Sequence, residues 1–138
     1  MLPIIWLALM LGGTTPAPAA EPPKPIPAKE EVAEPVLTIE ERIRLQAKAY
    51  NVDPELALAI SFCESRRTQY NEDGSVLRGK ENPKDVGIFQ INEKYHLEES
   101  IKRGIDIYTV EGNIEYAMQL LKEQGSRPWN WSKPCWGK

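Results

Sequence analysis

Hydrophobic side chains recur every third or fourth position in several stretches of the chain, which is the spacing of one face of an α-helix. The first predicted helix begins after Thr38, because Thr38 and Glu41 fit a capping box, and it runs to Asn51. Its apolar stripe consists of Ile39, Ile43, Ala47 and Tyr50.

Two further helices are predicted with the same reasoning. One begins at Asp53-Pro54, with the aspartate as N-cap and the proline at the first helical position, and extends to about Ser65. The other lies between Thr109, which can cap a helix, and Gly125, which can end one. Its apolar stripe consists of Ile114, Ala117, Met118 and Leu121.

The segment of residues 68–84 lacks this periodicity. It is polar and rich in Asn, Asp and Gly, which favours turns or a small hairpin over a helix. A short helix is expected at residues 97–103. The whole pattern predicts a mainly α domain, of α+β type, with a small irregular or β-hairpin segment.

The first 36 residues follow a different pattern. An apolar run at residues 2–11 is too short to span a bilayer and leads into Ala-Pro-Ala-Ala, so residues 1–20 are interpreted as an export signal. No Lys or Arg precedes this run, and the alternative is an uncleaved apolar anchor. Many prolines follow, which favour extended backbone, so residues 21–36 are interpreted as a Pro-rich linker and residues 37–138 as the working domain.

Charge and cysteine content narrow the class of this domain. It has 15 basic and 16 acidic residues, which does not indicate nucleic-acid binding. In an exported protein, Cys63 and Cys135 are interpreted as a disulfide, which would stabilise the fold by roughly 4 kcal/mol at most. The alternative is a buried free thiol at Cys63 and an unrelated exposed thiol at Cys135.

One acidic residue continues the apolar stripe of the second predicted helix. That stripe consists of Leu56, Ala59, Ile60 and Cys63. The next position in the series is Glu64, and a carboxylate directed at a core costs free energy unless it is paired or protonated. Burial and the negative end of the helix dipole would both raise its pKa, which suits a general acid. The alternative is that Glu64 turns to solvent or pairs with Arg66 or Arg67.

Two sequence blocks carry a resemblance to known enzymes. The block AISFCES at residues 59–65 resembles the helix end that bears the catalytic Glu-Ser of lytic transglycosylases, and DVGIFQIN at residues 85–92 resembles their G-[LI]-[MFL]-Q-[IV] segment. A looser match, WNWSKPCW at residues 129–136, is similar to the tail of small phage and bacterial lysozyme-like domains. The chain therefore resembles the lysozyme-like superfamily, and within it the SLT-type transglycosylases.

The resemblance implies a fold and places three residues at positions of the family's site. The fold is lysozyme-like, a helical domain with a cleft, with Glu64 as general acid at a helix end on one wall and the second block opposite. Gln90 matches a substrate-lining position. Asp85 stands where animal-type lysozymes have a second carboxylate and where many lytic transglycosylases have none; it also suits a turn after Asn82-Pro83-Lys84.

Two mechanisms remain open for cleavage of the β-1,4 bond between N-acetylmuramic acid and N-acetylglucosamine in peptidoglycan. In the first, Glu64 protonates the glycosidic oxygen, Asp85 acts as nucleophile or stabilises the transition state, and water completes hydrolysis with retention. In the second, Glu64 acts alone as acid and then as base, and the muramic acid 6-hydroxyl closes a 1,6-anhydro ring.

Polar and aromatic residues near the two blocks are candidates for binding sugars. Amide groups suit N-acetyl groups and hydroxyls, although they also stabilise turns. Aromatic rings present a flat apolar face to a sugar, although near a C-terminus they also cover cores, and Ile88 is expected in the core more than its neighbour. The candidate substrate-binding residues are Ser65, Phe89, Gln90, Asn92, Tyr95 and Trp129, with Trp131 as an alternative to Trp129.

No cofactor or metal is expected. His96 is the only histidine, and two distant cysteines cannot complete a metal cluster around it, so it is expected to hydrogen-bond locally. Residues 71–75 faintly resemble a calcium loop but lack its spaced acidic ligands and closing glutamate, and they are interpreted as a turn.

Three classes of function are compatible with these observations. The leading hypothesis is a secreted, periplasmic or envelope-associated monomeric enzyme that cleaves peptidoglycan glycan strands, with no nucleic-acid partner and no stable membrane span after signal cleavage. The second is a catalytically silent module on the same fold that binds cell-wall glycan or a protein. The third, a plain helical interaction domain, leaves the GIFQIN block unexplained. Glu64 favours an enzyme, because a binding module has no need for a carboxyl on an apolar stripe.

Overall fold

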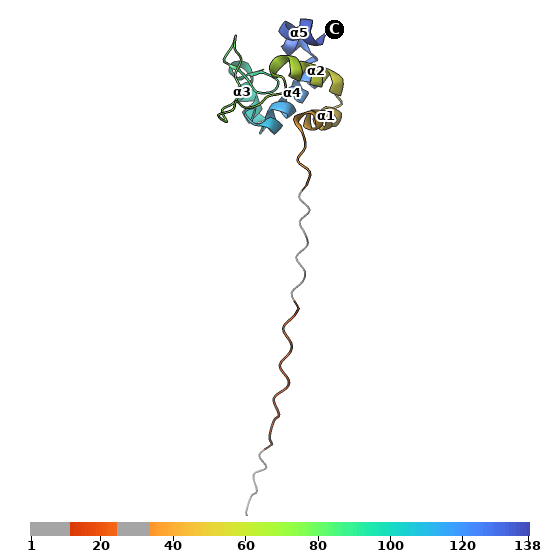
Figure 1. Cartoon of the computed structure of the whole chain (residues 1–138), viewed down its shortest axis with the longest axis vertical. Helices are drawn as coiled ribbons and strands as arrows, with labels where there is room; N and C mark the ends of the chain where they lie inside the picture. Colours follow the sequence, from red (N-terminus) through yellow and green to blue (C-terminus); the bar gives the residue numbers. More distant parts are fainter. Residues whose placement is uncertain (1–11, 25–33) are drawn as a thin grey trace, which may run out of the picture. The chain divides into compact units, whose positions relative to one another are not determined.

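The longest helix in the described part of the chain, α4 (Val110–Gln124), is also the element with the most buried residues. The structure is a computed structural model that describes residues 12–24 and 34–138. Helices α1 (Ile39–Ala49) and α2 (Pro54–Ser65) pack against each other, and α1 also packs against α4. Helix α3 (Glu93–Lys102) joins α4 through hydrogen bonds from Arg103 and His96, and Figure 1 shows α4 among these helices.

The predicted helix starts are present. Thr38 and Glu41 form a complete capping box, Asp53 accepts a hydrogen bond from the backbone N–H of Glu55, and Thr109 accepts one from that of Gly112. Each side chain satisfies a donor that the first turn of a helix leaves unpaired. α4 ends at Gly125, as expected. The mainly helical α+β prediction is therefore confirmed.

A small antiparallel sheet lies in the DVGIFQIN block. Strands β1 (Asp85–Val86) and β2 (Ile91–Asn92) pair with Asp85 opposite Asn92. The preceding polar segment contributes isolated antiparallel bridges, Tyr70 with Val76 and Arg78 with Val86. Helix α3 begins at Glu93, four residues before the predicted start, because Asn92 at the end of β2 caps it through the backbone N–H of Lys94.

The end of the chain forms two short helices that the periodicity did not predict. These are the 3₁₀-helix η1 (Arg127–Ser132) and α5 (Lys133–Trp136), and both pack against α2. Each is too short to show a hydrophobic repeat. The predicted disulfide between Cys63 and Cys135 is present, with the two Cα atoms 6.0 Å apart, and it fastens this tail to the end of α2.

The buried face of α2 differs from the predicted stripe. Its fully buried residues are Ala57, Leu58, Ile60 and Ser61. Leu56, Ala59, Cys63 and Glu64 are only half-buried. The difference arises because α2 is covered by α1 and also by the C-terminal helices, so the inward face is displaced from the stripe that the hydrophobic residues indicated.

The amino-terminal segment up to Glu34 and residues 35–138 are two separate units. Residues 12–24 are exposed and contain neither helix nor strand. The apolar run at residues 2–11 and residues 25–33 of the predicted linker lie outside the described residues, so the signal and linker remain predictions. Among the residues that are described, no helix is long and apolar enough to cross a membrane.

Candidate active site

Glu64 is the penultimate residue of α2, at the point where this helix ends. Arg66 and Arg67, which follow the last residue of α2, adopt left-handed backbone conformations with φ of 54° and 61°. These conformations end the helix. Glu64 is half-buried and forms no ion pair among the described residues. Arg67 instead pairs with Glu40, and Arg66 lies over the ring of Phe62.

The adjacent Ser65 brings the two predicted sequence blocks together. Its hydroxyl donates a hydrogen bond of 2.7 Å to the backbone oxygen of Ile88 and accepts one of 3.0 Å from the backbone N–H of Thr68. The end of α2 is therefore tied directly to the middle of the second block. Since both hydrogen bonds are made to the protein, Ser65 acts here as a structural link.

Two buried amide side chains, neither of them singled out by sequence reasoning, hold the second block in place. The Asn113 side chain, on α4, accepts a hydrogen bond of 2.9 Å from the backbone N–H of Phe89 and donates to the backbone oxygens of Val86 and Ile107. Gln69 accepts one of 3.0 Å from the backbone N–H of Ile88. Buried amides matched to backbone groups in this way fix a loop that has little regular secondary structure.

Asp85 lies at the start of the second block and acts on Glu64. Its carboxylate accepts a hydrogen bond of 2.7 Å from the side chain of Asn92, its partner in the sheet. Its negative charge is close enough to raise the pKa of Glu64. The two candidate carboxyl groups therefore interact electrostatically.

Burial is the largest influence on Glu64. Removal from water raises the pKa of its carboxyl, a hydrogen bond from Ser132 opposes this effect, and Asp85 adds to it, with a net rise. A raised pKa keeps a larger fraction of the carboxyl protonated near neutral pH. This is the property that general acid catalysis requires of a glutamate.

Comparison with known proteins decides the family. Residues 41–135 match the family described as Transglycosylase SLT domain, a stretch that includes Glu64, Asp85 and the hydrogen-bonded segment between them. The chain belongs to this family. Membership supports a lytic-transglycosylase type of peptidoglycan function at the level of the family.

One curated protein is also similar to the SLT chain. It is named Endoribonuclease YbeY and comes from Geobacillus thermodenitrificans (strain NG80-2); the two are 34% identical over 98 residues. The match covers 70% of this chain and 60% of that relative, so the chain spans less than two thirds of the relative's length. No solved structure matches the chain.

Ser132 is a further site residue that no sequence pattern singled out. Its hydroxyl donates a hydrogen bond to Oε1 of Glu64 and also lies near the C-terminal tryptophans. Ser132 ends η1, three residues before Cys135, so the disulfide and the short helices of the tail bring it to the end of α2. Ser132 lies within the WNWSKPCW match, which was a signal for the tail as a whole. No local sequence pattern connects Ser132 to Glu64.

The structure separates the predicted substrate-binding residues into two groups. Phe89 and Trp129 are buried, at 0% and 4% exposure, and their rings pack edge to face at 6.0 Å, so the expectation that they contact sugars is replaced by a role in the core. Tyr95 and Trp131 are open to solvent, at 71% and 98% exposure. The same packing buries Ile88, as predicted.

The two predicted amide residues also make contacts within the protein. Gln90 has a left-handed backbone with φ of 50°, and its side-chain N–H donates to the backbone oxygen of Gly87 at 3.0 Å. Asn92 caps α3 and donates to Asp85. Both therefore stabilise the turn and the sheet around Asp85, which was the alternative interpretation of these residues.

His96 hydrogen-bonds locally, as expected. Its Nδ1 lies 3.1 Å from the hydroxyl of Tyr116, and burial lowers the pKa of the imidazole, with a further lowering from Arg103. No group of acidic, histidine or cysteine side chains suited to a metal ion is found in the described ranges. Residues 71–74 form a turn, closed by a backbone hydrogen bond from Gly74 to Asn71.

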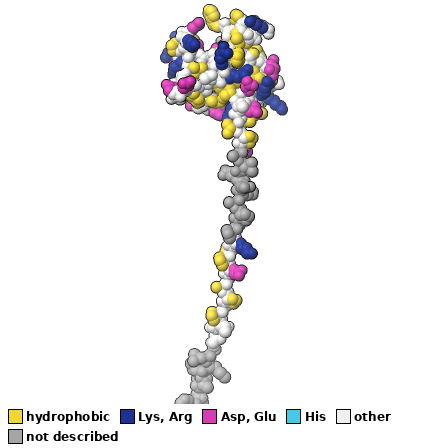
Figure 2. All heavy atoms as spheres, in the orientation of Figure 1, with side chains coloured by type: hydrophobic (Ala, Val, Ile, Leu, Met, Phe, Trp, Pro, Cys, Tyr) yellow, Lys and Arg dark blue, Asp and Glu magenta, His cyan; other side chains and the backbone are white. Residues whose placement is uncertain are grey.

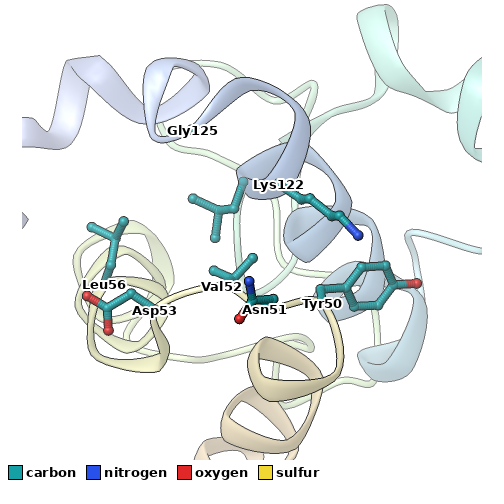
Figure 3. A pocket seen from close by; sticks show the side chains of 8 residues that line it. Tyr50, Asn51, Val52, Asp53, Leu56, Lys122 and Gly125 are labelled. Carbon is teal, nitrogen blue, oxygen red and sulfur yellow. The ribbon is translucent and has the colours of Figure 1, made fainter.

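A surface pocket of about 460 Å³ lies elsewhere in the SLT domain, and Figure 3 shows the side chains that surround it. The turn between α1 and α2 and the C-terminal end of α4 line it, and it shares no lining residue with the Glu64 site. Its lining residues are Tyr50, Asn51, Val52, Asp53, Leu56, Leu121, Lys122 and Gly125. The acidic residue of this lining, Asp53, is already engaged as the cap of α2.

Proposed function

We propose that this SLT domain cleaves the β-1,4 bond between N-acetylmuramic acid and N-acetylglucosamine in peptidoglycan, with Glu64 as the general acid. The observation that carries the proposal is a half-buried glutamate at the end of α2, whose pKa is raised by burial and by the charge of Asp85. Membership of the SLT family supplies the substrate class. Glutamates are mostly exposed to solvent, so the partial burial of Glu64 is unusual for this residue type.

The chemistry follows from the two carboxyl groups. Glu64 gives its proton to the glycosidic oxygen, so that the bond between this oxygen and the anomeric carbon of muramic acid breaks and the N-acetylglucosamine side leaves with a hydroxyl. Positive charge develops at the anomeric carbon, and the negative charge of Asp85 stabilises it. The Glu64 carboxylate then accepts the proton of the muramic acid 6-hydroxyl as this oxygen closes the 1,6-anhydro ring.

The family favours this ring closure over attack by water, and product analysis separates them. Mass spectrometry of the released fragments identifies 1,6-anhydro ends if the 6-hydroxyl attacks and reducing ends if water does. Reducing ends alone would replace transglycosylation by hydrolysis, and in the retaining form of hydrolysis Asp85 is nucleophile or stabiliser. Either product is consistent with Glu64 as the acid.

The test of the acid is Glu64→Gln on purified cell walls, measured by loss of turbidity or release of a dye. We expect the rate to fall by roughly a hundredfold to ten thousandfold, with an unchanged far-UV spectrum, because the amide has no acidic proton. Glu55→Gln is the matched control, since Glu55 is exposed at the other end of α2. Equal clearing by Glu64→Gln and wild type would remove Glu64 as the acid.

A catalytically silent glycan-binding module is the second candidate. It would sediment with cell walls, release no fragments, and bind equally well as wild type or Glu64→Gln. RNA serves as a further control substrate, because the Geobacillus relative is named an endoribonuclease. We expect no RNA cleavage, since the domain has nearly equal numbers of basic and acidic residues, and Figure 2 shows both kinds of charge on one face.

The same proposal places the protein outside the cytoplasm. Disulfides such as Cys63–Cys135 form and persist in oxidising compartments, and the glycan strands lie there too. Secretion with removal of residues 1–20 is part of this proposal. Sequencing the amino terminus of the mature protein from the envelope or medium tests it directly.

A further inference from the structure

The hydroxyl of Ser132 lies among three hydrogen-bonding groups, one of which belongs to the proposed general acid. It contacts Oε1 of Glu64, lies 3.0 Å from the indole Nε1 of Trp136 and lies 3.1 Å from the backbone oxygen of Trp129. A hydroxyl has one proton to donate and two lone pairs that accept. The identities of the three partners therefore restrict how the proton of Ser132 is used.

The indole N–H of Trp136 can only donate, and it lies 3.0 Å from the hydroxyl of Ser132 and 3.2 Å from the backbone oxygen of Trp129, so with either acceptor it leaves the serine proton for another group. Two acceptors are in reach, the Trp129 carbonyl and Oε1 of Glu64, and a carboxylate oxygen is a stronger acceptor than a neutral carbonyl. The acid proton of Glu64 is therefore disfavoured on the oxygen that accepts the hydrogen bond from Ser132. The second oxygen, Oε2, has no hydrogen-bond partner among the described residues.

We propose that Ser132 is a positioning residue that selects the proton-bearing oxygen of Glu64: it holds Oε1 as an acceptor, so that the acid proton resides on Oε2, the oxygen left free to meet a sugar. This inference rests on the proposed function of Glu64. The hydrogen bond remains in place when Oε2 has given up its proton, so the carboxyl keeps its orientation while it waits to act as a base. Ser132 itself neither gains nor loses a proton.

The disulfide keeps Ser132 close to Glu64. The disulfide joins Cys63, which precedes Glu64, to Cys135, three residues after Ser132, so both sides of the hydrogen bond are fastened.

Among charged groups on the surrounding elements, Asp85 of β1 acts on Glu64. Arg127 of η1 and Lys133 of α5 are exposed, and Glu40 of α1 is paired with Arg67.

The test compares Ser132→Ala with Ser132→Thr, which keeps the hydroxyl, on soluble glycan-strand fragments. Ser132→Ala should lower kcat by roughly ten- to a hundredfold with little change in KM, because the carboxyl is misoriented. It should also move the alkaline limb of the pH profile to higher pH, since the lost hydrogen bond had lowered the pKa of Glu64. Ser132→Thr should restore both. Ser126→Ala, at the start of η1 and without a capping hydrogen bond, is the control and should match wild type.

A second readout does not depend on catalysis. The carboxyl carbon of Glu64, followed by NMR during a pH titration, should titrate at higher pH in Ser132→Ala than in wild type. An unchanged titration, or a fall in kcat without any movement of the alkaline limb, would overturn the role of Ser132. If instead the titration moves while wild type and Glu64→Gln release equal amounts of product, the hydrogen bond is as described and the proposed function of Glu64 is what fails.

Discussion

At the scale of single residues, the two carboxyl groups are both half-buried but accept hydrogen bonds from different kinds of side chain. Glu64 sits half-buried at a helix end with one hydrogen-bond donor, whereas Asp85 accepts from an amide side chain within a small sheet. A low-dielectric setting favours the protonated form of the first, and the negative charge of the second favours it further. Differences of this kind between neighbouring carboxyl groups are how an enzyme assigns an acid and a stabilising charge.

Asp85→Asn should shift the pH dependence of cleavage in a direction that the charge determines. The acid works only when protonated, so activity is lost as the pH rises through the pKa of Glu64. Because the charge of Asp85 raises that pKa, its removal should move the alkaline limb to lower pH, opposite to the shift expected for Ser132→Ala. The rate at the optimum should fall about tenfold or more, as the transition state loses a stabilising charge.

The measurement is the rate of fragment release between about pH 4 and 9, a range that extends upward from the ordinary pKa of a glutamate. Asp73→Asn is a suitable control, because Asp73 is an exposed turn residue that bonds to Ser75. Full activity and an unmoved limb in Asp85→Asn would eliminate the participation of Asp85 in the reaction.

At the scale of elements, the second block is a loop held in shape by side chains from elsewhere. Gly87 lies at its centre, where its φ of 74° and the two buried amides leave no room for a side chain. A Cβ there would lie 2.4 Å from Oε1 of Gln69 and 2.5 Å from Nδ2 of Asn113. The glycine therefore permits the close approach that lets both amides bond to the loop.

Gly87→Ala should destabilise the domain by about 3 kcal/mol or more, since it combines a disfavoured backbone conformation with overpacking. Gly104→Ala isolates the backbone contribution, because Gly104 has a similar φ of 71° and nothing within 4 Å of an added Cβ. It should cost about 1 kcal/mol. Urea denaturation of both variants measures the difference, and equal losses would show that the buried amides do not restrict this position.

At the scale of the whole domain, the Cys63–Cys135 disulfide encloses the second block, α3 and α4 in one covalent loop. It also fastens the tail that carries Ser132 to the helix that carries Glu64. The hydrophobic core of the domain is continuous and includes residues of α1, α2, α4 and the second block. Stability and site geometry are consequently linked through the same bond.

Replacement of both cysteines by serine should lower the free energy of unfolding by about 2 to 5 kcal/mol, because the unfolded chain gains freedom. Thermal melts of wild type and the double variant, each with and without reductant, measure this. Reductant should lower the melting temperature of wild type and leave that of the variant unchanged, since the chain has only these two cysteines. A loss of cleavage at temperatures where the variant stays folded would show that the bond also holds Ser132 at the site.

Local patterns in the sequence determined the principal helices, because their caps and hydrophobic repeats act within a few residues: Thr38, Asp53 and Thr109 begin helices where expected. The Glu64 and Asp85 hypotheses came from the same sequence, through one anomalous position and a resemblance. The tertiary structure decided what depends on distant segments. It buried Phe89 and Trp129, matched Asn113 and Gln69 to the second block, and brought Ser132 to Glu64 from 68 residues away, since hydrogen bonds and burial depend on distances that no local pattern records.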